Sequence, residues 1–495
     1  MKKNNIFLII FIVLTLLFNC IILLKNDFIS FDKQFIVRYS IFSLIVILLF
    51  NFILRKKIDI KKYFIFIYVV LGFLYLFSFP INSLPDEDHH FYRSYEITKG
   101  RLMSEKQKKE KGYIGVVNIS DNIAKVSKVK PTYKTNIDFK NIKDNHKNFR
   151  YVELTNISLY SFICYIPQAF GVFIGKFLHL PIIYWEFLAR ICNFLLFSLL
   201  LKFSLDHIPY KKSTLMFIAL LPMTFQIAIS MSADCMTMGV SIALISYVLE
   251  LISKPNEKIN KKDYIIVTIL SLVLALCKII YLPICLLMFF IPETKFVSKK
   301  EKFTRLGLIF LLVLIANLSW LSLASQYLAA LNNSDLQLKY ILCNPLKYLY
   351  IIINTIIENS KNYLYMFYGS SLGTYKVNLS SIYIDCIFVV NIILILFDTE
   401  NDKIDKSIKY GSLFIFMMVF GLMATSLYLD WTPYMSNLIE GIQGRYFLPV
   451  SILVPMIFST NWFNLKNKKY LNCTSLILLM IIINLYSLTM ISMYY

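Results

Sequence analysis

The residues best suited to chemistry lie directly after an apolar run, in the segment Pro85–Arg93 (PDEDHHFYR). Three carboxylates, Asp86, Glu87 and Asp88, and two imidazoles fall within five positions. Adjacent carboxylates repel one another, so Asp86 or Glu87 is a candidate general base. A second interpretation is a hard divalent cation, Mg²⁺ or Mn²⁺, held by Asp86, Asp88 and His89. A third is structural: the proline ends the apolar run and the acidic residues form a solvated cap on the next helix.

A second group of ionisable residues lies within or beside apolar runs, where each charge costs roughly 2.5–3.5 kcal/mol on insertion scales. The group is Arg190, Asp234, Lys278 and Arg445. Structural alternatives are snorkelling for Arg190, helix capping for Asp234 and an ion pair between Asp234 and Lys278. The functional interpretation is one pocket in which Arg445 and Lys278 hold the phosphate of a donor. Its other predicted lining residues are Arg190, Asp234, Asn193, Tyr281, Gln443 and Tyr446.

These residues must be positioned by membrane-spanning helices. The 495 residues are 57% hydrophobic and only 16% charged, against about 25% charged in a typical soluble domain. The apolar runs predict an all-α integral membrane protein with about 13 transmembrane helices. The predicted spans are 5–24, 35–54, 62–80, 183–204, 213–230, 235–252, 263–278, 282–293, 306–326, 380–398, 410–429, 446–462 and 471–492.

The charge of the loops predicts which side of the membrane each one faces. The net charge is +21, but its clusters sit in short loops between spans, so we expect no nucleic-acid partner. All five basic loops become cytoplasmic if the N-terminus is cytoplasmic and the segments 157–178 and 345–368 do not cross. We therefore expect those two segments to be interfacial or re-entrant pieces on the outer face. The basic loops are Arg55–Lys62, Lys211–Lys212, Lys254–Lys262, Lys295–Arg305 and Lys466–Lys469.

The predicted organisation has four parts. Residues 1–61 supply two N-terminal helices, and 62–326 form a transmembrane core that includes the external loop 81–155. That loop is expected to carry short interfacial helices, and its length exempts it from the charge rule for short loops. Residues 327–379 are an external or interfacial segment, and 380–495 are C-terminal transmembrane helices. The nine cysteines are scattered without C-x-x-C spacing, which argues against a disulfide framework or a zinc site.

Several strings resemble a large bacterial family of multi-pass membrane proteins of unknown function, which is related to the GT-C superfamily of polytopic glycosyltransferases. The segment Pro85–Arg93 resembles the family's signature at the start of its first external loop, and Gly444–Pro449 (GRYFLP) resembles its C-terminal signature. Weaker resemblances are Ser232–Asp234, Lys278 with Tyr281 and Pro283, and Gly369 with Leu372–Gly373. Thr374 departs from the aromatic residue expected after Gly373.

The resemblance implies a GT-C-like bundle in which an acidic residue of the first external loop is catalytic base or metal ligand, and it places Asp86 and Glu87 in that role. It also implies a polyprenyl-phosphate-linked sugar as donor. We therefore expect sugar transfer to a cell-surface glycan, lipid or glycopolymer on the outer face of the bacterial cytoplasmic membrane. Three rivals remain: a polysaccharide polymerase or ligase, a transporter of lipid-linked sugars, and a non-catalytic membrane protein. A transporter predicts an internal repeat and charges at the midplane of the bilayer, and the sequence has neither.

Overall fold

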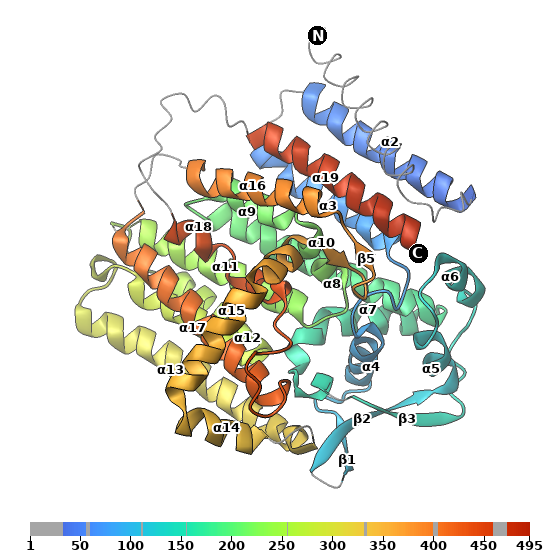
Figure 1. Ribbon diagram of the computed structural model, residues 1–495, viewed down its shortest axis with the longest axis horizontal. Helices are drawn as coiled ribbons and strands as arrows, with labels where there is room; N and C mark the ends of the chain where they lie inside the picture. The colour runs from blue at the N-terminus through green and yellow to red at the C-terminus, as the bar shows by residue number, and fades with distance from the viewer. Residues whose placement is uncertain are drawn as a thin grey trace.

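The N-terminal helices pack beside the last helix of the chain. The computed structural model describes residues 33–55, 60–109, 112–154, 156–254, 256–330, 334–398, 404–458 and 473–495. The predicted span 5–24 and the basic loop Lys466–Lys469 lie outside these residues. Helices α2 (Lys33–Arg55) and α3 (Ile60–Ser78) both contact α19 (Cys473–Tyr494), as Figure 1 shows. A buried hydrogen bond from the Tyr75 hydroxyl to Asn484 Oδ1 (2.8 Å) joins α3 to α19.

The protein is mostly helical, as predicted, but the external loop adds a small sheet that the sequence did not predict. Strands β1 (Glu105–Lys108), β2 (Tyr113–Ser120) and β3 (Phe149–Glu153) are antiparallel in the order β1-β2-β3, with Val117 opposite Val152. The side chains of β2 are mostly buried, which is why this β-branched stretch forms the central strand. Two short helices, α5 (Asp121–Ser127) and α6 (Tyr133–Phe139), lie between β2 and β3.

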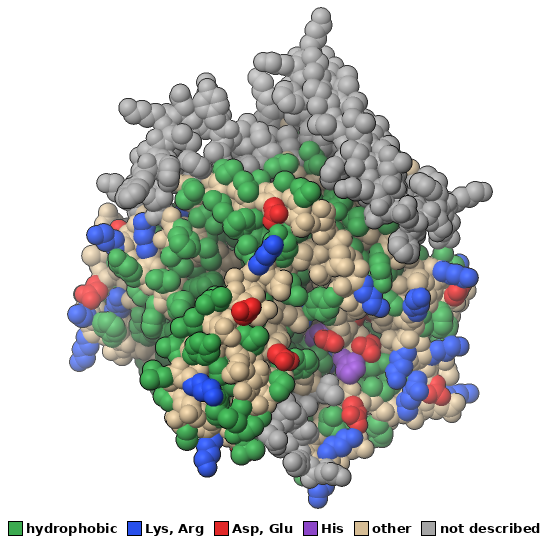
Figure 2. All heavy atoms as spheres, viewed as in Figure 1, with side chains coloured by type: hydrophobic (Ala, Val, Ile, Leu, Met, Phe, Trp, Pro, Cys, Tyr) green, Lys and Arg blue, Asp and Glu red, His purple; other side chains and the backbone are tan. Residues whose placement is uncertain are grey.

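Helix α4 (Glu87–Ile97) links this sheet to the helical body. Its Glu96 accepts hydrogen bonds from the Ser104 hydroxyl (2.8 Å) and the Glu105 amide (3.2 Å), and it pairs with Arg93 at 2.8 Å. Charged side chains gather over the part of the surface where Figure 1 places β1–β3, α5 and α6, whereas hydrophobic side chains dominate the rest of this face (Figure 2). The contrast matches a water-exposed subdomain beside a body that faces lipid.

The centre of the body is built around α11 (Asp234–Ser253), whose membrane-length window is 94% buried. It packs on α8 (Ile182–His207), and α8 also packs on α7 (Ile166–Phe177). Between α8 and α11 the predicted span 213–230 is broken: α9 (Lys212–Ala219) and α10 (Pro222–Ile229) meet at 65°. Pro222 explains the break, because a proline lacks the amide proton of a continuous helix and disfavours helical geometry before it.

The second half alternates long helices with irregular pieces. Two of these, the 3₁₀ helices η3 (Ile279–Phe290) and η6 (Gly444–Val450), contain Pro283 and Pro449. A hairpin of β4 (Ser371–Leu372) and β5 (Val377–Asn378) separates α15 from α16. The other elements are η1 (Asn156–Leu159), η2 (Phe162–Tyr165), α12 (Lys261–Cys277), η4 (Glu293–Lys295), α13 (Lys299–Ala324), η5 (Ser325–Ala330), α14 (Ser334–Cys343), α15 (Pro345–Tyr368), α16 (Ser381–Phe397), α17 (Lys406–Asp430) and α18 (Leu453–Ile457).

The predicted thirteen spans are not confirmed. Within the described residues, four segments are long and apolar enough to cross a membrane: α8, α11, Lys299–Tyr327 (α13 with the start of η5) and α17. The count rises to six if each bent pair, α9 with α10 and α14 with α15, is one span. The segment 157–178 divides into η1, η2 and α7, and 345–368 is α15, bent by 106° from α14. Several of the predicted spans are interrupted by proline or form helices shorter than a full span, and others lie wholly or partly outside the described residues.

Candidate functional site

The carboxylate of Glu87, at the start of α4, is fully engaged by Arg190 of α8. Glu87 Oε1 accepts from Arg190 Nε at 2.6 Å and Oε2 accepts from Nη2 at 2.5 Å, with both side chains at most 1% exposed. The remaining donors of Arg190 bind the carbonyl oxygens of Phe79 and Pro80, each at 2.8 Å. A bidentate pair of this kind fixes geometry. Glu87 and Arg190 therefore hold the turn after α3 in place, and neither group faces open space.

Asp86, one residue earlier, is exposed and adopts a left-handed backbone conformation (φ 53°). Its side chain makes no capping hydrogen bond to α4, so the capping role proposed from the sequence is not what the carboxylate does. A left-handed conformation in a residue other than glycine is strained, and such strain persists where the surrounding structure imposes it, often at functional sites. Asp86 is thus the most exposed carboxylate of this motif, since Glu87 is buried and Asp88 is about one-third exposed.

Three of the four predicted ionisable residues meet at Asp234, the first residue of α11, whereas the fourth, Arg190, pairs with Glu87. Lys278 Nζ, between α12 and η3, lies 2.5 Å from Asp234 Oδ1, and Arg445 Nε, in η6, lies 3.9 Å from Oδ2. All three side chains are 13–15% exposed. The Asp234–Lys278 ion pair that the sequence offered as a structural alternative is therefore present. Because two cations face one carboxylate and Arg445 Nε has no hydrogen-bond partner, the cluster has one positive charge in excess.

His90 joins α4 to this cluster, although sequence analysis did not select it. The side chain is buried, and its Nδ1 lies 2.8 Å from the Tyr165 hydroxyl. Burial lowers the pKa of His90 to about 3; Asp234 opposes this shift, and Arg445 and Lys278 add to it. His90 is therefore neutral near pH 7. Helical spacing could have found it, because Glu87, His90 and Ser94 form one buried stripe of α4.

Aromatic residues surround the cations. Lys278 Nζ lies 5.1 Å from the ring centre of Tyr160 and 5.5 Å from that of Tyr446, both within cation–π range. The Tyr281 hydroxyl donates to the Tyr446 carbonyl oxygen at 2.8 Å, which fixes η3 against η6. The predicted residues Tyr281 and Tyr446 therefore lie at the cluster, and Tyr160 is an addition that the sequence did not indicate.

Tyr375, in the β4–β5 turn, connects the cluster with Asp86. Its hydroxyl donates to the side-chain oxygen of the predicted residue Gln443 at 2.8 Å. Burial raises the pKa of Tyr375, Arg445 opposes the shift, and Asp86 and Asp234 contribute to it. Tyr375 thus lies within the electrostatic reach of both Asp86 and Arg445, and it also has a left-handed backbone (φ 60°).

Asn193 does not reach the cluster with its side chain. It is buried in α8 and donates to the Ser230 carbonyl oxygen at 2.7 Å. Like Arg190 one turn earlier, it fastens α8 to a neighbouring connection, here the one between α10 and α11. Both residues act as supports for the site.

The structure gives no support for a cation at Asp86, Asp88 and His89. Among the residues that it describes, no group of three or more His, Cys, Asp or Glu side chains could hold a metal ion. Asp88 Oδ2 lies 3.9 Å from His89 Nε2, with both side chains about one-third exposed.

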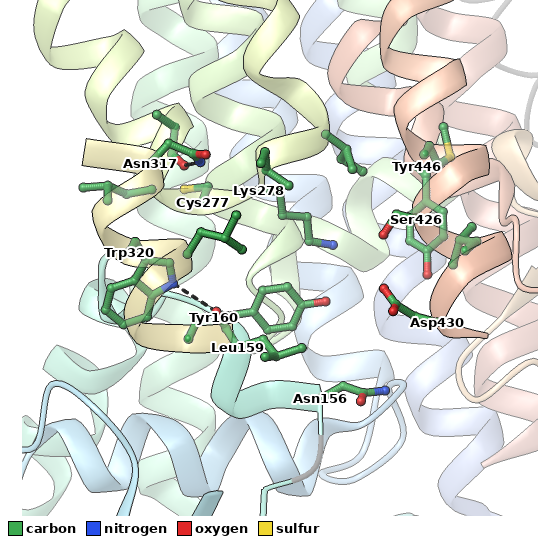
Figure 3. A pocket seen from close by; sticks show the side chains of 18 residues that line it. Asn156, Leu159, Tyr160, Cys277, Lys278, Asn317, Trp320, Ser426, Asp430 and Tyr446 are labelled. Carbon is green, nitrogen blue, oxygen red and sulfur yellow. Dashed lines mark hydrogen bonds between the residues drawn. The ribbon is translucent and has the colours of Figure 1, made fainter. Parts of the chain in front are cut away.

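A cavity of about 300 Å³ adjoins the cluster on the side of Lys278 (Figure 3). Polar groups lie at one end, where the amine of Lys278 points toward Tyr446, Ser426 and Asp430. Asn317 and Trp320 of α13 lie at the other, and both are tied by hydrogen bonds to carbonyl oxygens, of Ala275 (2.6 Å) and Leu159 (3.0 Å).

These features define a helical membrane protein with a charged, partly buried cluster beside a cavity. Residues 66–454 match the family described as "Predicted membrane protein (DUF2142)", and because the match covers most of the chain, the protein belongs to that family. No curated protein and no solved structure matches the chain. The family description supports the membrane assignment and names no activity.

Proposed function

We propose that the protein is a GT-C-like membrane glycosyltransferase. It would move a sugar from a polyprenyl-phosphate-linked donor to a cell-surface glycan, lipid or glycopolymer on the outer face of the bacterial cytoplasmic membrane. The observation that carries the proposal is the cluster of Asp234, Lys278 and Arg445, whose Lys278 also lines a cavity. The exposed carboxylate of Asp86 acts electrostatically on Tyr375, as Arg445 does. The GT-C relationship rests on the sequence resemblance alone.

The chemistry follows from these charges. Asp86 accepts the proton of an acceptor hydroxyl, whose oxygen then forms a bond to the anomeric carbon of the sugar. The bond between that carbon and the phosphate oxygen breaks, and its electron pair leaves on the phosphate. Arg445 and Lys278 stabilise this growing negative charge. Asp234 pairs with both cations, so that an arriving phosphate meets two cations held by one carboxylate.

The roles first considered for Glu87 and Arg190 change in this scheme. Their side chains are buried and bonded to each other, so we assign them to positioning the Asp86 turn. Tyr446 remains a pocket residue, because it lines the cavity beside Lys278. Gln443 is not among the residues that line the cavity, and its role is to accept the hydrogen bond of Tyr375.

A deletion strain complemented with variants tests the proposal by its profile of surface glycans. We expect Asp86→Asn and Arg445→Met to lose the glycan while the protein persists in the membrane. Asp88→Asn is the matched control, since it removes an adjacent carboxylate that is partly exposed and near His89. Full restoration of the glycan by Asp86→Asn would reject the catalytic assignment. Loss of glycan with lipid-linked donor trapped on the inner leaflet would instead identify a transporter.

A further inference from the structure

The cavity beside Lys278 has the form of a site for an amphiphile. We propose that it takes the apolar chain of a lipid phosphate, which reaches it sideways from the bilayer between α13 and α17. The proposal rests on the proposed function, because it gives the donor of that reaction a place in this chain. It does not depend on which sugar is transferred.

Most of the side chains that line the cavity are apolar, and its polar groups lie at Lys278, Ser426 and Asp430 at one end and at Asn317 and Trp320 at the other. Apolar side chains from five elements, η1, α12, η3, α13 and α17, form most of the wall, and they have no hydrogen-bonding groups to offer a sugar. Such a wall favours an apolar ligand through burial of its surface. The apolar members are Leu159, Ala275, Leu276, Ile279, Ile280, Leu321, Ala324, Met423 and Leu427.

The polar end of the cavity opens on the cationic cluster. Lys278 belongs to both, since its amine lines the cavity and also pairs with Asp234. Tyr446 is likewise shared: its side chain lines the cavity and its neighbour Arg445 carries the guanidinium of the cluster. An anionic head placed at the cations would therefore leave its apolar chain directed into the aliphatic part.

The two flanking helices are those that show lipid the most surface. The apolar window of Lys299–Tyr327, which includes α13, is 17% buried, and that of α17 is 39% buried, against 94% for α11. Helix α13 packs on α12, and α17 packs on η3. The cavity lies between these two pairs, and Ile279 and Leu321 at its rim are 42% and 38% exposed. Its apolar side is thus reached from the bilayer rather than through the charged subdomain.

The volume limits how much of a chain the cavity holds. About 300 Å³ is at the lower end of the size of ligand pockets. It would accept the segment nearest the phosphate, while the rest of a long chain stays in the bilayer. A short-chain lipid phosphate should therefore bind as a long one does.

Trp320 supplies a direct readout, because it lines the cavity. The experiment titrates farnesyl phosphate into the full-length protein in nanodiscs and follows tryptophan emission. Two control ligands are titrated in the same way: farnesol, which lacks the phosphate, and inorganic phosphate, which lacks the apolar chain. We expect farnesyl phosphate to bind at least tenfold more tightly than either half. Trp320→Phe should remove the signal, which assigns it to the cavity.

Filling the cavity separates this proposal from its rivals. Ala275 is 1% exposed and lines the cavity, so Ala275→Phe should weaken binding of farnesyl phosphate at least tenfold. Leu318→Phe is the matched control, since Leu318 is 58% exposed on the same helix as Trp320, and its binding should equal that of the wild type. Wild-type affinity in Ala275→Phe, or equal affinity for inorganic phosphate, would overturn the proposal.

A cross-linking experiment and a binding measurement on Asp86→Asn complete the test of the cavity. If Ala275→Phe fails to fold, a benzophenone-tagged farnesyl phosphate is cross-linked to the wild type, and adducts outside residues 156–160 and outside α12, η3, α13, α17 and η6 reject the site. Because the assay measures binding alone, Asp86→Asn should bind farnesyl phosphate normally. Binding in the cavity together with a normal glycan in Asp86→Asn would leave this inference standing and remove the proposed function.

Discussion

Replacing Glu87 by Gln should destabilise the protein strongly, because it removes the carboxylate that binds Arg190 through two hydrogen bonds where water does not reach. Arg190 would keep only two carbonyl acceptors and the neighbouring buried Glu186. The pair is at most 1% exposed, so no screening by solvent reduces its strength. Removing one partner of a buried ion pair costs about 3–5 kcal/mol. A change of that size lowers the folded-to-unfolded ratio by about two to three and a half powers of ten.

The assay is equilibrium unfolding by SDS in mixed micelles, followed by circular dichroism and run on four proteins. These are the wild type, Glu87→Gln, Arg190→Gln and the double variant. Because the double variant carries no unpaired charge, we expect it to be more stable than the sum of the single losses by about 2 kcal/mol or more. Asp88→Asn should change the midpoint little, since exposed pairs contribute about 0–1 kcal/mol.

Two outcomes would refute the positional role of Glu87. The first is a wild-type midpoint for Glu87→Gln, which would mean that the ion pair does not hold the turn. The second is a wild-type midpoint combined with complete loss of the surface glycan, which would return Glu87 to the role of catalytic base.

Three other predictions follow from the same structure. An epitope inserted at Lys128, in the charged subdomain, should be labelled on intact cells, whereas one at Lys258 should be labelled only after permeabilisation; the reverse pattern would invert the proposed orientation. Gly444→Ala should destabilise by about 1–3 kcal/mol, because an added Cβ would lie 2.2 Å from the Tyr363 backbone oxygen; an unchanged thermal midpoint would contradict this packing. The third prediction concerns pH: His90 has a pKa of about 3 when folded and about 6.5 when unfolded, so protonation favours the unfolded chain below pH 6.5. Between pH 6.5 and 5 the protein should lose about 2 kcal/mol of stability, and His90→Gln should flatten this part of the curve of thermal midpoint against pH.

The residues that meet at the site were more predictable than the path of the chain between them. Asp234, Lys278 and Arg445 each interrupt or border an apolar run, and placing those runs in a membrane puts all three on one side. The breaks in the helices could also have been predicted, because Pro222, Pro283 and Pro449 fall inside apolar runs. A prediction from hydrophobicity alone treats each of these runs as one continuous span.

The different roles of Glu87, which pairs with Arg190, and Asp86, which is exposed, were not predictable from the sequence. Glu87 and Asp86 are neighbours of the same chemical type, and what distinguishes them is Arg190, which is 103 positions from Glu87. Pairing over that distance depends on how α8 packs against the turn after α3. The small sheet was missed for a related reason: β1 and β3 are short and mostly exposed, so neither strand has the hydrophobic alternation that identifies a half-buried strand.

The left-handed backbone of Asp86 implies that the residue that best stabilises the fold at this position differs from the residue that the proposed activity needs. Glycine adopts this conformation without strain, so Asp86→Gly should relieve strain while it deletes the proposed base. A selection of randomised variants for heat resistance alone should therefore enrich glycine at this position, and one that also demands surface glycan should eliminate it. Sequencing the two pools would show, without any purified substrate, whether the strained backbone at this position is retained because the carboxylate is needed for activity.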